Sequence, residues 1–245
     1  PGVAGLAVGV GLLMLAVLSS AESVAPVTTL LLAACGLAVL GLALLHEHRL
    51  RQRGGQPAVD LRLLRIASLW RGLVGVTAFM LYFASFLYLL TNVLQRGLGL
   101  SAWHAGLVFV PSGVTFAASS LLFRHWSAAH QIRSITIGCC ITMAGLGLAA
   151  WGTLAGSAPV AFLITAVVLT GVGNGLTLPV LIGYALAEVP RSDAGIGSAL
   201  VSTVQQFASA LGVVVFGTAF HGLSRAGRPD DMVRAMGGCV LAQAG

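Results

Sequence analysis

The chain has 245 residues, of which 57% are hydrophobic and only 8% are charged. Soluble domains contain roughly 25% charged residues, so the composition excludes a water-soluble protein. The net charge of +6 comes from arginine alone on the basic side, and no soluble module interleaves these arginines with aromatic residues. We therefore expect no nucleic-acid partner.

Seven apolar stretches follow one another along the chain, each about as long as a bilayer is thick. They cover residues 2–19, 26–45, 68–94, 102–123, 134–154, 159–187 and 195–221. None shows the alternation of a barrel strand, and a backbone in lipid must satisfy its own hydrogen bonds, so we expect helices. A further apolar stretch starts at Met232 and stops after about half a span. The sequence predicts an all-α transmembrane bundle of about seven spans plus a truncated eighth, and looks like a piece of a longer protein.

Arginines mark one side of this bundle. The 46–65 loop holds five of them, and the 124–133 and 188–194 loops hold three more. These loops fall on the same side if every span crosses the membrane. The positive-inside rule makes that side cytoplasmic, so Pro1 starts inside the cell.

No pattern in the sequence indicates catalysis, a cofactor or a metal. All seven acidic residues lie in loops or at span ends, whereas an intramembrane aspartyl protease needs two within the membrane. The 171–175 run (GVGNG) lies inside an apolar span and not between a strand and a helix, so it does not indicate a phosphate loop. His46, Glu47 and His48 lack the spacing of a zinc motif, and the four cysteines are scattered. We expect a non-enzymatic protein without cofactor or metal.

Polar residues recur at helical spacing within two spans. In the 68–94 span they are Tyr82, Ser85, Tyr88, Asn92 and, just beyond, Gln95. In the 195–221 span they are Ser198, Ser202, Gln205, Ser209 and Gly212, with Gln206 on the adjoining row. Steps of three and four place each set along one side of a helix. Such stripes either mediate helix packing or line a polar cavity. Because amides are costlier to bury, a cavity-lining role is an equal alternative for Asn92, Gln205 and Gln206.

The other spans carry weaker signals. Thr115 and His104 lie on one side of the 102–123 span, and His104 is near its outer end. The row Gly171, Gly175 and Pro179 indicates chiefly helix packing, because glycines permit close backbone approach and proline supplies a kink. A kinked, tightly packed helix can also act as a gate.

Several of these segments resemble one family in order along nearly the whole chain. Residues 88–95 (YLLTNVLQ), 105–107 (AGL) and Pro111 resemble the ninth and tenth helices of the fourteen-helix drug:proton antiporters of the major facilitator superfamily. Residues 59–65 (VDLRLLR) resemble the stretch that enters the family's ninth helix, residues 171–179 its glycine-rich twelfth helix and residues 193–212 its thirteenth. The 124–133 segment (RHWSAAHQIR) departs from it, because it lacks the glycine of the family's basic turn.

The resemblance implies a domain layout. Residues 1–45 would be the two linker helices between the halves, residues 46–66 a cytoplasmic basic loop, and residues 67–245 the carboxy-terminal half-bundle with its last helix truncated. The whole would lie in the plasma membrane of a bacterium.

The resemblance also implies export of amphipathic organic compounds in exchange for protons, by alternating access around a site between the two halves. The partners are then a small-molecule substrate, the lipid bilayer and a proton that is coupled through the amino-terminal half. We expect the substrate cavity to receive Tyr82, Asn92, Gln95, Thr115, Ser202, Gln205 and Gln206. Helix packing or gating residues are expected at Gly171, Gly175, Pro179 and Gly212. The alternatives are an uptake permease of the same superfamily and a non-transporting membrane scaffold or sensor.

Overall fold

The computed structural model describes residues 63–154, 160–223, 235–239 and 243, together with isolated residues between 8 and 42. Most of the described residues are in helices, the others lie in turns, bends and short connections, and none of them is in a strand. The predicted spans 2–19 and 26–45 lie largely outside the described residues. The loop up to residue 62, including His46 to His48, and most of the segment after Met232 lie outside them as well.

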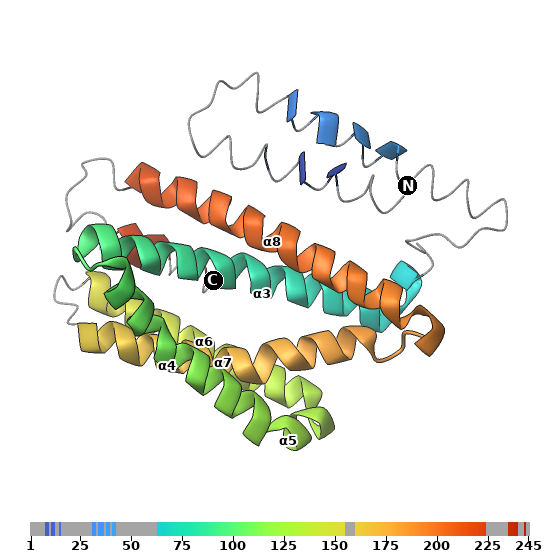
Figure 1. Cartoon of the computed structure of the whole chain (residues 1–245). Coiled ribbons are helices and arrows are strands. Elements are labelled where there is room, and N and C mark those ends of the chain that lie inside the picture. Colours follow the sequence, from blue (N-terminus) through green and yellow to red (C-terminus); the bar gives the residue numbers. More distant parts are fainter. Residues whose placement is uncertain are drawn as a thin grey trace. The chain divides into compact units, whose positions relative to one another are not determined.

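The long helices follow one another in the predicted order (Figure 1). The elements are η1 (Leu63–Arg65), α3 (Ala67–Asn92), η2 (Val93–Gly97), α4 (Ala102–Leu122), α5 (Arg124–Ala129), α6 (Gln131–Leu154), α7 (Val160–Leu186), η3 (Arg191–Asp193) and α8 (Ala194–Leu223). In the described part of the chain, five helical segments are long and apolar enough to cross a membrane. The all-α fold and five of the seven predicted spans are therefore confirmed.

The connection between α3 and α4 follows from its local sequence. The α3 helix widens into the π-helical turn η2, where the amide of Leu98 donates to the carbonyl of Val93 at 2.8 Å. Gly99 then takes a φ of 66°, a left-handed conformation that glycine adopts without a steric penalty. Ser101 caps α4, because its hydroxyl accepts a hydrogen bond from the amide of His104 at 3.4 Å.

The 124–133 segment differs from the loop that the sequence analysis expects. Arg124–Ala129 form the short helix α5, and α6 already begins at Gln131. The segment holds neither glycine nor proline, so it contains no strong helix breaker, and only His130, with a φ of −129° and a ψ of 53°, separates α5 from α6. The ring of Trp126 also stacks on His130, one turn later, with 5.6 Å between ring centroids. The glycine that is missing from the family's turn explains why this turn is helical.

The structure divides into two compact units. The first unit contains the chain up to Leu81 and the segment Ala185–Val215. Within it, the first part of α3 packs closely on α8, because a Cβ added at Gly212 would collide with the backbone of Leu81. A Cβ at Gly72 of α3 would likewise collide with Ala185 at the end of α7.

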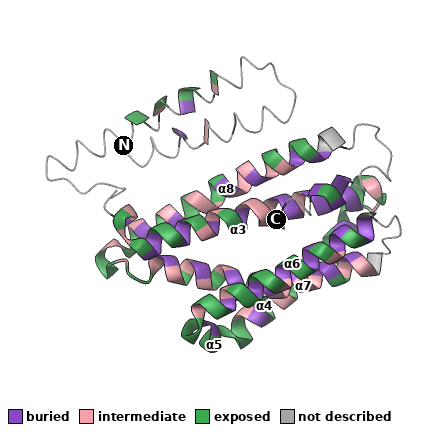
Figure 2. Ribbon diagram, turned by 180° about the vertical axis from the view of Figure 1, so that it is seen from behind, coloured by how far each residue is buried: buried purple, intermediate pink, exposed green. Residues whose placement is uncertain are grey.

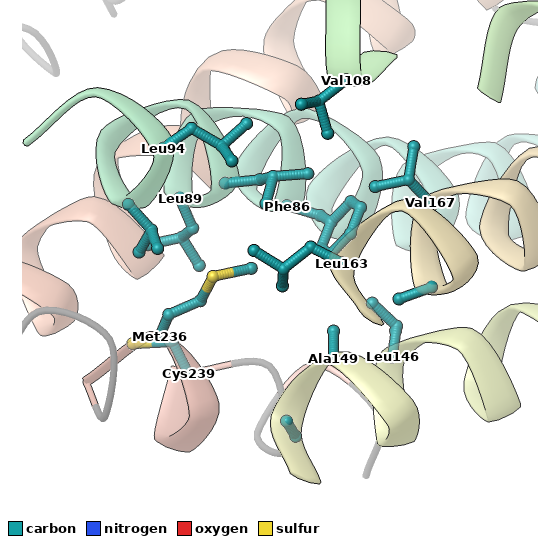
Figure 3. Packing of buried hydrophobic residues seen from close by; sticks show 14 of the residues in the cluster. Phe86, Leu89, Leu94, Val108, Leu146, Ala149, Leu163, Val167, Met236 and Cys239 are labelled. Atoms are coloured by element: carbon teal, nitrogen blue, oxygen red, sulfur yellow. The ribbon is translucent and has the colours of Figure 1, made fainter. Parts of the chain in front are cut away.

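The second unit contains Tyr82–Tyr184 and Phe216–Gly245 and holds the main hydrophobic core. Figure 3 shows Phe86 and Leu89 of α3 packed with Leu163 of α7 and Met236 of the last described helical segment. Exposed residues predominate on α4 and α5 (Figure 2). In the most apolar window of α7, 56% of the residues are buried, against 17% in α4. The α7 helix is thus central to this unit, and α4 leaves much of its surface for lipid.

Candidate functional site

Three polar side chains meet inside the second unit, and we call them the Asn174 cluster: Tyr82 of α3, Thr142 of α6 and Asn174 of α7. The hydroxyl of Tyr82 donates to Asn174 Oδ1 at 2.8 Å, and the hydroxyl of Thr142 donates to the same oxygen at 3.3 Å. Asn174 is only 2% exposed. Because a buried amide is costly unless it is hydrogen-bonded, these two bonds tie α3 and α6 to one point on α7.

The α7 helix presents small residues to α4. A Cβ added at Gly171 would collide with the hydroxyl of Thr115 and would lie 2.6 Å from the carbonyl oxygen of Ser112. The hydroxyl of Thr115 also lies 3.3 Å from the carbonyl oxygen of Val168 on α7. Only glycine at residue 171 therefore allows the two helices to approach this closely.

The same arrangement repeats one turn further along α7. A Cβ added at Gly175 would collide with the hydroxyl of Ser119 and the carbonyl of Phe116. The hydroxyl of Ser119 lies 3.2 Å from the carbonyl oxygen of Val172, across the helix contact. Residues 171 and 175 thus form one continuous contact with α4.

A second face of α7 packs on α6 through glycines of both helices. A Cβ added at Gly138 would lie 2.7 Å from the carbonyl oxygen of Gly173. A Cβ added at Gly173 would lie 2.5 Å from the carbonyl oxygen of Gly138. Real Cβ atoms essentially never come within 3.0 Å of another heavy atom, so the two backbones touch directly. The α7 helix is therefore in close contact with two neighbours, and Asn174 bonds it to the third.

The structure separates the predicted polar row of α3. Tyr82 belongs to the Asn174 cluster, and its ring centroid lies 6.3 Å from that of Phe86. Asn92 is half-buried, and its amide nitrogen donates to the carbonyl of Tyr88 on the same helix at 2.9 Å. Gln95 is exposed in η2. The row thus extends from a buried network to an exposed helix end.

The polar stripe of α8 also divides into two parts. Ser202 and Gln206 are exposed and Gln205 is half-buried. Further along, the hydroxyl of Ser209 donates to the carbonyl of Gln205 at 2.7 Å and lies 3.5 Å from Met80 Sδ of α3. Gly212 lies against α3, as described above. The contacts support packing for the later part of the stripe and leave the earlier part accessible.

The two weaker candidates on α4 have local partners. Thr115 lies in the α4–α7 contact and also donates to its own helix at the carbonyl of Pro111, at 2.9 Å, which favours packing over a cavity role. His104 Nδ1 lies 2.8 Å from the hydroxyl of Ser101, within the cap of α4. Among the described residues, no three His, Cys, Asp or Glu side chains gather where a metal could bind.

Sequence reasoning missed Asn174 and Thr142. An Asn in the middle of a long apolar helix is itself a signal, because polar side chains are costly in lipid. That signal was available at residue 174, within the glycine run considered as a phosphate loop. Thr142 carried none, since threonines in apolar spans commonly bond their own helix.

The comparison with known families decides the identity of the fold. The pattern of the Major Facilitator Superfamily matches residues 2–213. The chain belongs to the Major Facilitator Superfamily. The chain therefore belongs to a family of multi-pass membrane transporters and not to a family of enzymes. This agrees with the resemblance noted in the sequence.

Several curated superfamily members are similar to the chain. It is 31% identical, over 88% of its length and 38% of the relative's, to a probable actinorhodin transporter of Streptomyces coelicolor. It is 30% identical, over 61% of its length and 31% of the relative's, to the cephamycin export protein CmcT of Amycolatopsis lactamdurans. It is 26% identical, over 89% of its length and 45% of the relative's, to a putative multidrug resistance protein MdtD of Salmonella heidelberg. The chain spans less than half the length of each of these relatives.

Proposed function

We propose that the protein exports amphipathic organic compounds from a bacterial cell in exchange for protons. The observation that carries this proposal is the similarity over 88% of the chain to a protein described as a probable actinorhodin transporter. Relatives described as export or resistance proteins support the outward direction. If the protein were an uptake permease of the superfamily, we would not expect proteins described as exporters among those similar to it.

The proposed layout follows the superfamily. Residues 1–45 are two linker helices, residues 46–66 a cytoplasmic loop, and residues 67–245 belong to the carboxy-terminal half-bundle. Pro1 lies on the cytoplasmic side, because the arginine-rich loops do. A second half-bundle completes the transport path, and the substrate binds between the halves near the membrane midplane.

The proposed cavity wall is the earlier part of the α8 stripe. Ser202, Gln205 and Gln206 are accessible, and small-molecule sites are mostly apolar with a few placed polar groups. We propose Tyr82, Asn92 and Gln95 of α3 as further substrate contacts. Gly171, Gly175, Pro179 and Gly212 act in packing or gating, and Thr115 acts with them.

The proton-coupling group is expected outside the described α-helices. Coupling needs a group that titrates as access to the cavity changes, and a carboxylate inside the membrane suits this because desolvation raises its pKa. Residues 63–187 and 194–229 contain no Asp or Glu. We therefore assign the coupling carboxylate to the other half-bundle.

Export can be tested in a drug-sensitive bacterial strain that expresses the full-length protein. Energised cells preloaded with the cationic dye ethidium should lose it faster than cells with an empty vector. A protonophore should abolish the difference. Faster entry of the dye would indicate an uptake permease, and unchanged dye movement across a panel of amphipathic compounds would indicate a scaffold or sensor.

A further inference from the structure

A pocket of about 180 Å³ lies between α4, α5 and α7 of the second unit. Its polar wall includes Arg124 and Ser127 of α5 and Gln131 of α6. Its apolar wall includes Pro179, Val180 and Gly183 of α7. The pocket therefore combines a cationic end with an apolar side.

Arg124 brings a positive charge that no acidic residue between 82 and 184 neutralises. Residues 82–184 contain no Asp or Glu, so no carboxylate of this segment can pair with it. Its Nε donates to His125 Nε2 at 3.0 Å, and no other described residue bonds its guanidinium. Four of the five N–H donors of the guanidinium are therefore available to an external acceptor.

The α5 helix is held in place by a buried hydroxyl chain. Ser134 Oγ lies 2.8 Å from Ser127 Oγ and 2.9 Å from the carbonyl oxygen of Leu176 on α7. A hydroxyl has one proton, so Ser134 donates to Leu176 and accepts from Ser127. This chain occupies the Ser127 proton and fixes α5 against α7. Arg124 and Gln131 remain as the donors that face a ligand.

The surroundings of α5 indicate the membrane interface. Leu121 and Leu122, which precede it, are 65% and 78% exposed, as expected for side chains in lipid. Phe123 and Trp126 are also exposed and pack edge to face, with 6.4 Å between ring centroids. Aromatic side chains beside arginine at the end of a span are typical of the headgroup region.

We propose that this pocket binds the headgroup of an anionic phospholipid. The phosphate accepts hydrogen bonds from Arg124 and Gln131, and the first part of the acyl chains lies along Pro179 and Gly183. Charge complementarity selects the anionic headgroup, and the adjoining apolar wall selects a lipid over free phosphate. Pro179 has no amide hydrogen, so the carbonyl of Gly175 lacks its usual helical partner. A bound lipid would thus connect α5 to the part of α7 that lacks a backbone hydrogen bond. This inference does not depend on which compound the protein transports.

The test measures lipid retention by native mass spectrometry of the full-length protein in detergent. Phosphatidylglycerol and phosphatidylcholine with the same acyl chains are the probes. The wild-type protein should retain phosphatidylglycerol in preference to phosphatidylcholine. Arg124→Gln should lower its apparent affinity about tenfold, as expected for a lost charge-assisted hydrogen bond. Arg133→Gln removes the same charge from an exposed residue outside the pocket wall and should change it less than about twofold.

A second variant tests the apolar wall without changing charge. A Cβ at Gly183 meets nothing within 4 Å, so Gly183→Leu should fold and occupy the pocket, again with about a tenfold loss. Gly113→Leu is the matched control, since residue 113 is also open and lies outside the pocket wall. If Arg124→Gln fails to fold, the comparison of Gly183→Leu with Gly113→Leu still tests the proposal.

Three results would overturn the proposal. Equal losses in Arg124→Gln and Arg133→Gln would indicate a diffuse basic patch. Equal retention of the two lipids would exclude headgroup selection. Displacement of phosphatidylglycerol by millimolar inorganic phosphate would show that the pocket takes the free anion instead.

Discussion

The contact between α4 and α7 predicts that one Gly→Ala substitution will destabilise the protein while another stabilises it. In a helix interior, Ala is favoured over Gly by about 0.5–1 kcal/mol. At Gly113 of α4 the added Cβ meets nothing within 4 Å, so Gly113→Ala should gain up to this amount. At Gly171 the Cβ would collide with Thr115 and with the backbone of Ser112. Overfilling a close contact costs roughly 1–3 kcal/mol, so Gly171→Ala should lower the free energy of unfolding by up to about 2 kcal/mol net.

The free energy of unfolding of the full-length protein in bicelles, measured by steric trapping, gives both values on one scale. Adding Thr115→Ala to Gly171→Ala should restore only part of the loss, because the carbonyl oxygen of Ser112 would still lie 2.6 Å from the new Cβ. Equal stability of Gly171→Ala and Gly113→Ala would refute the close contact. Full rescue by Thr115→Ala would mean that the side chain alone sets the helix spacing.

Three further predictions concern the buried network, the cavity and the topology. In a double-mutant cycle, Tyr82→Phe and Asn174→Leu should show a coupling free energy of about 0.6–1.7 kcal/mol in unfolding measurements. Strictly additive effects would contradict the hydrogen bond between Tyr82 and Asn174. Gln205→Leu should change the rank order of compounds that cells resist, normalised to the amount of protein in the membrane, because a cavity wall tolerates an apolar side chain but loses a placed polar group. A uniform loss of resistance in proportion to protein would assign Gln205 to packing. In a cysteine-free background, an impermeant thiol reagent added to intact cells should label Ala102→Cys and not Ala129→Cys, because the positive-inside rule predicts that the arginine-rich side is cytoplasmic. The opposite labelling would invert the proposed orientation.

The sequence was sufficient for the spans, because apolar length and the need to satisfy backbone hydrogen bonds in lipid leave few alternatives. The ends of the helices were less predictable, because they depend on local chemistry. The start of α6 at Gln131 and the helix α5 depend on the absence of a breaker in 124–133, whereas polar composition suggested a loop. A polar residue within an apolar span can be found in the sequence, but the residue that it bonds to cannot.

The site shows the same limit. Helical spacing placed Ser202, Gln205, Ser209 and Gly212 on one side of α8, but only tertiary packing shows that the last two face α3. The role of Tyr82 required Asn174, which is 92 residues away along the chain. No periodicity in either helix indicates that pairing. The cavity assignments themselves stay predictions until substrates are tested.

The central claim, export in exchange for protons, is tested most directly with the purified full-length protein in liposomes. A pH gradient, acidic inside, is imposed on the vesicles. Labelling of the Ala129→Cys variant by an impermeant thiol reagent added outside identifies the protein that is inserted inside out. Because the cytoplasmic face of that protein points outward, export corresponds to accumulation of ethidium within the vesicles. The account predicts accumulation that stops when nigericin collapses the gradient. Accumulation that persists without the gradient, or no dye movement with any of several amphipathic compounds, would contradict it.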